Sequence, residues 1–170
     1  FKMVKLSNSI KRIKPSATMA VTQQARELKS QGKDIIGLGA GEPDFDTPEH
    51  IKNAAITAIN NGDTKYTPVD GTPELKSAIK DKFKRDNNLE YNLDEISVGT
   101  GGKQIIFNAF AVTLDKGDDV LIPAPYWVTY PDVVNYFNAQ NIFIECSESN
   151  NFKITPKQLD ESITPSTKWF

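Results

Sequence analysis

The stretch most informative about the fold is Ile96-Ser97-Val98-Gly99-Thr100-Gly101-Gly102-Lys103-Gln104. It contains a candidate strand and a candidate turn, and it begins a candidate helix. Its first three residues predict a buried strand, and the glycines that follow predict a tight turn. A helix is expected next, because apolar residues recur at helical spacing through residues 105–112. The stretch therefore predicts a strand, a glycine turn and a helix in immediate succession.

The same alternation continues after this stretch. Residues 120–122 and 142–144 are short apolar runs that predict two more strands, and residues 133–137 between them predict a helix. Residues 168–170 begin another apolar run, so we expect a further strand there and a truncated domain whose sheet continues past this point. Buried strands separated by helices predict an α/β fold, with a mostly parallel sheet and helices on both faces.

Helices and loops also alternate before the glycine turn. Residues 16–31 predict a helix, and residues 34–39 predict a buried strand that leads into the loop 40–45. Thr47 and Thr72 are each followed by proline and glutamate. This pattern predicts that each threonine caps the amino-terminal end of a helix.

Composition excludes several classes of function. The 170 residues include 20 Lys and Arg against 22 Asp and Glu, a net charge of −2, so the chain has no overall basic character of the kind that favours nucleic-acid binding. One cysteine and one histidine support neither a disulfide framework nor a zinc site. No apolar run has the length of a signal-peptide core or a membrane span. We expect a cytoplasmic protein with a small-molecule partner, no metal, no nucleic acid and no membrane association.

The glycine turn is the first candidate binding site. A helix that begins there presents backbone N–H groups and the positive end of its dipole, an arrangement that binds phosphate. Gln104 stands where a dinucleotide fingerprint needs its third glycine and where a P-loop needs serine or threonine. NAD and nucleoside triphosphates are therefore disfavoured as ligands. A tight turn that only requires positive φ angles explains the glycines equally simply.

Two further segments carry side chains with more than one interpretation. Trp127 follows a predicted strand at its carboxyl end, where ligands of α/β sheets bind, and its indole could stack on a flat heteroaromatic ring. A buried core aromatic at the start of a helix is the commoner explanation of such a residue. The carboxylates of the loop 40–45 could serve acid–base chemistry, but helix capping and turn formation explain them more simply.

Five motifs, taken together and in order, resemble the class I pyridoxal-phosphate-dependent aminotransferases. They are Lys14-Pro15-Ser16-Ala17-Thr18, Gly41-Glu42-Pro43-Asp44-Phe45-Asp46-Thr47-Pro48, Lys65-Tyr66-Thr67-Pro68, Gly101-Gly102-Lys103-Gln104 and Pro125-Tyr126-Trp127-Val128-Thr129-Tyr130-Pro131. The sequence is most similar to the bacterial aspartate aminotransferases, including the group that also accepts prephenate. The resemblance implies fold type I, with residues 1–45 belonging to the small domain and substrate loop. Residues 46–170 are then the incomplete first part of the large cofactor-binding domain.

The resemblance implies a pyridoxal 5′-phosphate site on residues of this chain. Gly101, Gly102 and Lys103 match the family's phosphate-binding turn, in which backbone amides hold the cofactor phosphate. Trp127 matches the aromatic residue that stacks on the pyridine ring. These roles agree with the physical interpretation of the glycine turn as an anion site.

The resemblance also implies the substrate contacts and the reaction. Gly41 matches the substrate-loop glycine, Trp127 borders the same site, and Lys14 matches a lysine linked to the second carboxylate of the substrate. The implied reaction is transamination of L-aspartate with 2-oxoglutarate to give oxaloacetate and L-glutamate, with prephenate as a further candidate substrate. Other class I aminotransferases, C–S lyases and a non-catalytic fragment are the alternatives.

Finally, the resemblance implies a homodimer and a catalytic lysine outside this chain. Tyr66 matches a tyrosine that reaches the cofactor phosphate of the neighbouring subunit, so the site is expected to be completed across a dimer. The lysine that forms a Schiff base with the cofactor is expected beyond Phe170. No catalytic residue is predicted within the 170 residues, and the chain alone is expected to be inactive.

Overall fold

A computed structural model describes residues 4–39 and 41–170 of the chain. The chain divides into two compact units. The sheet unit consists of the residues up to Gly37 together with Lys103–Phe170, and the helical unit consists of Leu38–Gly102. The boundary predicted between residues 45 and 46 concerns the domains of the complete protein and not these two units, and it stays a prediction.

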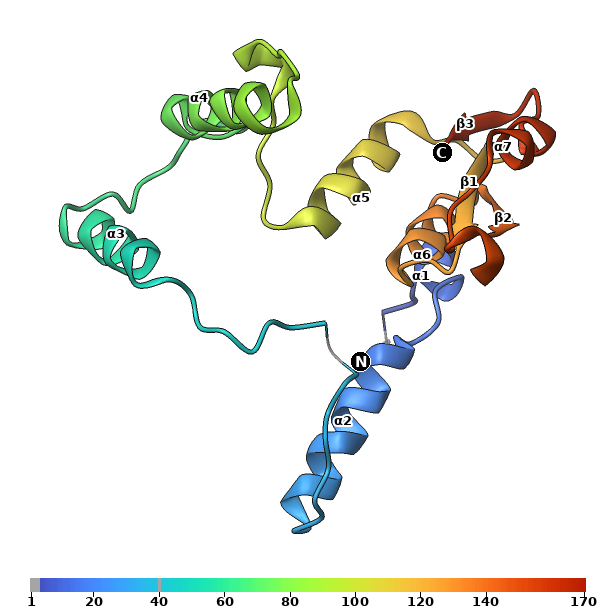
Figure 1. Ribbon diagram of the computed structural model, residues 1–170, viewed down its shortest axis with the longest axis horizontal. Helices are drawn as coiled ribbons and strands as arrows, with labels where there is room; N and C mark the ends of the chain where they lie inside the picture. The colour runs from blue at the N-terminus through green and yellow to red at the C-terminus, as the bar shows by residue number, and fades with distance from the viewer. Residues whose placement is uncertain (1–3, 40) are drawn as a thin grey trace. The chain divides into compact units, whose positions relative to one another are not determined.

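The sheet unit contains a three-stranded parallel sheet (Figure 1). Its strands are β1 (Asp119–Ala124), β2 (Gln140–Glu145) and β3 (Thr167–Trp169), arranged in the order β2-β1-β3. β1 pairs in parallel with both neighbours, and Leu121 lies opposite Ile142 in the first pair. The predicted parallel α/β arrangement is therefore confirmed, as are the strands expected at 120–122, 142–144 and the last residues.

Helices connect these strands as parallel pairing requires. The helix α5 (Gly102–Thr113) precedes β1, and α6 (Thr129–Tyr136) connects β1 to β2. The 3₁₀ turn η3 (Glu148–Asn150) and α7 (Pro156–Ser162) connect β2 to β3. The predicted helices after the glycine turn and through residues 133–137 are thus present.

The core lies where α5 and α6 meet β1. Phe110 and Leu114 from α5 and its end pack with Val120 and Ile122 of β1 and with Val134 of α6, and all five are buried. Leu121 is also buried, with 2% of its surface exposed, so three successive residues of the central strand avoid water. This continuous burial is typical of a strand with neighbours on both edges and both faces.

The carboxyl-terminal strand is fastened to α5 by an aromatic residue. The indole N–H of Trp169 donates a hydrogen bond of 2.8 Å to the hydroxyl of Thr113, and its ring packs 5.3 Å from the ring of Phe110. A partly buried indole that packs against the core and satisfies its single donor fits a position at the edge of the core. Trp169 therefore links β3 to the helix that begins at the glycine turn.

The amino-terminal residues form two helices of the sheet unit. α1 (Asn8–Lys11) is attached to α6, because the guanidinium of Arg12 donates hydrogen bonds of 2.7 and 2.6 Å to the carbonyls of Asn135 and Tyr136. Such bonds satisfy carbonyls at the end of a helix, where the dipole also favours a cation. α2 (Ala17–Ser30) confirms the predicted first helix and buries none of its residues.

The described residues of the helical unit form four short elements. They are α3 (Glu49–Asn60), α4 (Pro73–Lys82), the π-helical turn η1 (Phe83–Asn87) and the 3₁₀ turn η2 (Leu93–Glu95). Thr72 caps α4 as predicted, since its hydroxyl accepts the N–H of Leu75 at 3.3 Å. The predicted cap at Thr47 is wrong by one residue: the capping position is Pro48, which has no side-chain acceptor, and Asp46 instead accepts the N–H of Thr47.

Two predicted strands are absent from the described residues. Residues 34–38 have no regular secondary structure, residue 39 lies in a bend, and the side chains of Ile36 and Leu38 are exposed. Residues 96–98 bury Ile96, but the backbone N–H of Val98 bonds to a loop carbonyl rather than to a strand. A strand requires a partner for its ladder of N–H and C=O groups, and an apolar run of sequence does not supply one.

Candidate functional site

The glycine turn leads directly into the first residue of α5. Gly101 has a φ of +84°, a conformation that L side chains rarely adopt, and α5 begins at Gly102. A Cβ atom built on Gly101 or Gly102 meets nothing within 4 Å, so the turn is open on its outer side. An open turn of this kind lets an anion approach the backbone closely.

The start of α5 is electrostatically suited to an anion. The first N–H groups of a helix have no intrahelical acceptor, and the dipole of a twelve-residue helix adds positive potential at this end. No acidic residue stands in the first turn of α5, whereas Lys103 adds a cation there. The residues present therefore fit a phosphate group, which prefers helix amino termini and basic side chains.

An indole lies beside the same helix start. The ammonium nitrogen of Lys103 is 5.4 Å from the centre of the Trp127 ring, within the range of a cation–π interaction. The ring of Tyr130 meets the same indole edge-on at 5.6 Å. Trp127 stands just past the carboxyl end of β1 and keeps 43% of its surface exposed, so it is not a core residue. The structure thus brings together two of the predicted cofactor-binding residues.

A groove of about 750 Å³ runs from this indole along the sheet unit. Its lining is mainly apolar and rich in aromatic rings, and includes Ile106, Phe110, Trp127, Tyr130, Trp169 and Phe170. The groove follows β1 from Val120 and reaches Trp127 just past the carboxyl end of that strand. The carboxyl ends of parallel strands are where ligands of α/β sheets usually bind. The groove supplies an apolar surface next to the cationic start of α5, which suits a ligand with both a flat ring and an anionic group.

The remaining predicted site residues are accessible, and their roles stay predictions. Tyr66 and Gly41 belong to the helical unit, where Tyr66 is fully exposed and a Cβ on Gly41 meets nothing within 4 Å. Lys14 belongs to the sheet unit and is exposed between α1 and α2. The residue before Gly41 lies outside the described ranges.

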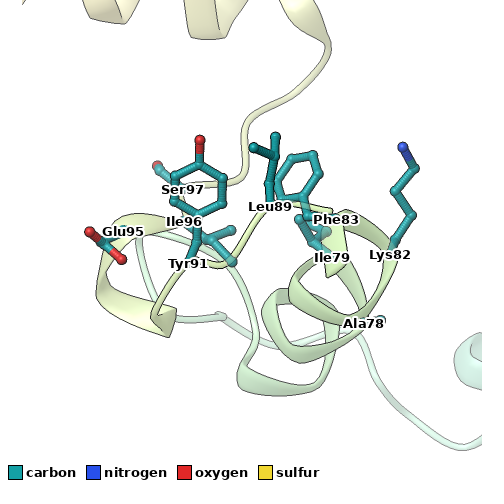
Figure 2. Close-up of a pocket in the computed structure, with 9 residues that line it drawn as sticks. All are labelled: Ala78, Ile79, Lys82, Phe83, Leu89, Tyr91, Glu95, Ile96 and Ser97. Atoms are coloured by element: carbon teal, nitrogen blue, oxygen red, sulfur yellow. The ribbon is translucent and has the colours of Figure 1, made fainter. Parts of the chain in front are cut away.

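A second groove, of about 790 Å³, lies in the helical unit (Figure 2). Figure 2 shows Ile79, Lys82 and Phe83 from α4 and its end on one side, and Tyr91 and Ile96 on the other. The Phe83 and Tyr91 rings meet at 5.7 Å with an interplanar angle of 63°. None of the residues predicted to bind cofactor or substrate lines this groove, so its size alone does not make it the functional site.

An ion pair near the glycine turn was not predicted from sequence. The Lys76 side chain of α4 is almost fully buried and its ammonium binds the carboxylate of Asp70. A lysine in a polar helix normally indicates a solvated face, so the residue type did not predict that Lys76 is buried. The one available signal was the turn Asp70-Gly71 directly before the Thr72 cap, which places a carboxylate six residues before residue 76.

This ion pair predicts how stability depends on pH. The hydrogen bond from Lys76 holds the pKa of the Asp70 carboxyl below its ordinary value of about 3.9. The stabilising contribution is therefore complete above the unfolded pKa and is lost as the pH falls through the lower folded pKa. We expect Asp70→Asn to flatten the fall in free energy of unfolding between about pH 5 and pH 2.

Urea denaturation at a series of pH values measures this effect. Asp81→Asn is the matched control, because Asp81 is an exposed residue of α4, the helix of Lys76, and forms no ion pair among the described residues. The expected result is a wild-type slope for the control and a shallower slope for Asp70→Asn. Identical slopes in all three proteins would show that the pair contributes nothing measurable to stability.

In the described part of the chain, no group of three or more histidine, cysteine, aspartate or glutamate side chains is arranged to hold a metal ion. None of the helices in residues 4–39 and 41–170 combines the length and hydrophobicity that crossing a membrane requires.

Comparison with known proteins identifies the group to which this architecture is related. Residues 33–170 match the family described as aminotransferase class I and II. A probable aspartate/prephenate aminotransferase of Rhizobium leguminosarum bv. phaseoli is 58% identical over 168 residues, which is 99% of this chain and 42% of that protein. The chain thus spans about two-fifths of the length of the curated relatives it matches.

Solved structures share the same fold. The crystal structure of the aspartate aminotransferase from Rhizobium meliloti superimposes with a TM-score of 0.91 at 50% identity, covering 98% of this chain and 42% of that one. The aspartate aminotransferase from Thermus thermophilus with maleate gives a TM-score of 0.93 at 45% identity, covering 97% and 43%. Both likenesses extend over nearly all of the present chain.

Proposed function

This chain belongs to the class I and II aminotransferase family, and on that basis we propose that it forms the phosphate-binding and ring-binding part of an aspartate aminotransferase. The reaction is transfer of the amino group of L-aspartate to 2-oxoglutarate, giving oxaloacetate and L-glutamate. The observation that carries the proposal is the contact between Lys103 and Trp127 at the open start of α5. The activity belongs to the complete protein, since the chain spans about 42% of its relatives.

The family implies pyridoxal 5′-phosphate as cofactor, and the residues present fit it. Gly101, Gly102 and Lys103 offer backbone N–H groups and a cation for the phosphate, and Trp127 offers an indole face for the pyridine ring. When bound, the cofactor supplies an electron-withdrawing ring that makes the α-proton of an amino acid easier to remove. The chain's own residues hold and orient it, and the lysine that moves the proton is proposed to lie after Phe170.

The substrate class follows from charge. Aspartate and prephenate both carry two carboxylates, and both appear in the names of relatives about 58% identical to this chain. The Thermus thermophilus structure was determined with maleate, another dicarboxylate. We propose that Lys14 binds the second carboxylate of such substrates and that Gly41, which lacks a side chain, lets the substrate approach the backbone. Prephenate is a further candidate substrate on the same grounds.

The oligomeric state, cellular location and partners that we propose are those of a soluble metabolic enzyme. We propose a homodimer in which Tyr66, whose side chain is fully exposed, reaches the phosphate site of the neighbouring subunit. A cytoplasmic location is supported by the single cysteine, Cys146, which is buried and unpaired. The partners are an amino acid and a 2-oxo acid, with no nucleic acid and no membrane.

Half-transamination of the complete, cofactor-loaded protein tests the proposal. The protein carrying the aldehyde form of the cofactor is mixed separately with aspartate, with an aromatic amino acid and with a cysteine conjugate. Prephenate is added to the protein carrying the amine form of the cofactor. In each case the absorbance of the aldehyde form is followed. We expect aspartate to react at least about tenfold faster than the aromatic amino acid, because a dedicated cation recognises its second carboxylate. A C–S lyase would instead release ammonia and a thiol without any 2-oxo acid acceptor, and that outcome would refute the proposal.

A further inference from the structure

The ion pair between Asp70 and Lys76 closes a loop of the helical unit. Lys76 lies one turn inside α4, and its backbone N–H bonds to the carbonyl of Thr72 at 3.0 Å. With 8% of its surface exposed, the residue is buried to a degree that is costly for a lysine without a charged partner. Asp70 is that partner. The buried stem and the paired head together hold the end of the loop against the helix.

Gly71 is enclosed between this lysine and Val98. Its φ is +107°, and a Cβ built on it lies 2.7 Å from Cγ2 of Val98 and 3.7 Å from Cγ of Lys76. The backbone N–H of Val98 donates a hydrogen bond of 3.0 Å to the carbonyl of Asp70. Val98 is therefore attached to the loop both by its side chain and by its backbone.

Val98 is the residue that immediately precedes the phosphate-binding turn. Gly99 follows it, and the carbonyl of Gly99 accepts the N–H of Gly101 at 2.9 Å, so the turn is short and internally bonded. Because no residue separates Val98 from the turn, a displacement of Val98 also displaces the first residue of the turn. Tyr66 lies in the same loop, four residues before Asp70.

We propose that Asp70 and Lys76 are positioning residues for the cofactor phosphate. Their ion pair holds the loop, the loop holds Val98, and Val98 places the glycine turn that binds the phosphate. Neither side chain touches the cofactor. The inference rests on the proposed function, because it assigns these residues to the phosphate site of that enzyme, and it adds a mechanical link between the Tyr66 loop and that site.

The test compares two ligands that differ only in the phosphate. The dissociation constants of pyridoxal phosphate and of pyridoxal are measured by absorbance titration of the complete apoprotein. Lys76→Met keeps an unbranched stem beside Gly71 and removes the ammonium, while Lys76→Arg keeps the cation. Lys82→Met is the matched control, because Lys82 lies on the same helix and binds the exposed side chain of Asn87 at 2.7 Å.

We expect Lys76→Met to weaken binding of pyridoxal phosphate by about tenfold, the equivalent of one well-placed hydrogen bond, and to leave pyridoxal binding nearly unchanged. Lys76→Arg should restore most of the preference for the phosphorylated ligand, and Lys82→Met should behave like the wild type. Such a selective loss is not produced by a general loss of stability, which weakens the binding of both ligands together.

Two outcomes overturn the inference, and a third contradicts the proposed function on which it rests. An unchanged preference in Lys76→Met overturns it, and so does an equal loss of affinity for both ligands, which indicates a purely structural role. If Lys76→Met does not fold, Asp70→Asn is judged by the same two criteria, because the half-exposed Asp70 is easier to replace. A wild-type protein that binds pyridoxal phosphate no better than pyridoxal contradicts the proposed function itself, and is thereby distinguished from a failure of the positioning role alone.

Discussion

Replacing Gly102 with aspartate is expected to weaken the binding of pyridoxal phosphate by about a hundredfold, because a carboxylate then stands within a few ångströms of the phosphate dianion. The structure leaves room for the new side chain, since a Cβ on Gly102 meets nothing within 4 Å. An acidic residue in the first turn of a helix also interacts favourably with the helix dipole. The variant should therefore be at least as stable as the wild type while it binds the cofactor poorly.

Opposite effects on stability and binding make this test sharp. Gly102→Asn is the matched control, because asparagine has the shape of aspartate without its charge and suits a helix start equally well. Thermal denaturation of the apoprotein and cofactor titration are measured for all three proteins. If Gly102→Asp and Gly102→Asn bind the cofactor equally well, the start of α5 is not the phosphate site.

The largest effect on folding is expected from Leu121→Ala, at about 3 kcal/mol of lost stability. Leu121 is in the middle of the central strand and is one of the two largest side chains that are fully buried. Truncation removes three carbon atoms from a close-packed region, and both the lost burial and the remaining cavity lower the free energy of unfolding. Urea denaturation followed by tryptophan fluorescence measures the change.

An exposed valine provides the comparison for this substitution. Val112 belongs to α5 and has 82% of its surface exposed, so Val112→Ala should change the stability by no more than about 0.5 kcal/mol. The same probe and the same denaturant serve both variants. A loss below about 1 kcal/mol for Leu121→Ala would show that the central strand is not packed as closely as the structure indicates.

Local patterns predicted those elements whose stabilising groups are close in sequence. The helix from Gly102 carries its own apolar face, and the strand from Asp119 is a continuous apolar run with turn residues on both sides. Such signals depend on nearest neighbours along the chain. The parallel pairing of the strands also followed, because the helices between them require it.

The predictions that were wrong concern structure that depends on a partner which the local residue pattern does not specify. Residues 34–39 have the composition of a strand, but strand structure requires a second backbone to complete its hydrogen bonds. Lys76 has the residue type of a solvated surface, and only the folded loop shows that Asp70 covers it. In the candidate site, Lys103 and Trp127 were both predicted, whereas their mutual contact required the structure.

The enclosure of Gly71 limits which amino-acid substitutions are tolerated at this position. Every single-base missense change of a glycine codon introduces a side chain with a Cβ atom. At this position that atom lies 2.7 Å from Val98 and on a backbone with a φ of +107°, so each accessible substitution is strained by sterics and conformation together. Mutation therefore cannot reach a tolerated residue here in one step. Selection against these strained substitutions should keep this codon encoding glycine even where the flanking loop diverges, and a saturation library scored for function should recover glycine alone at residue 71.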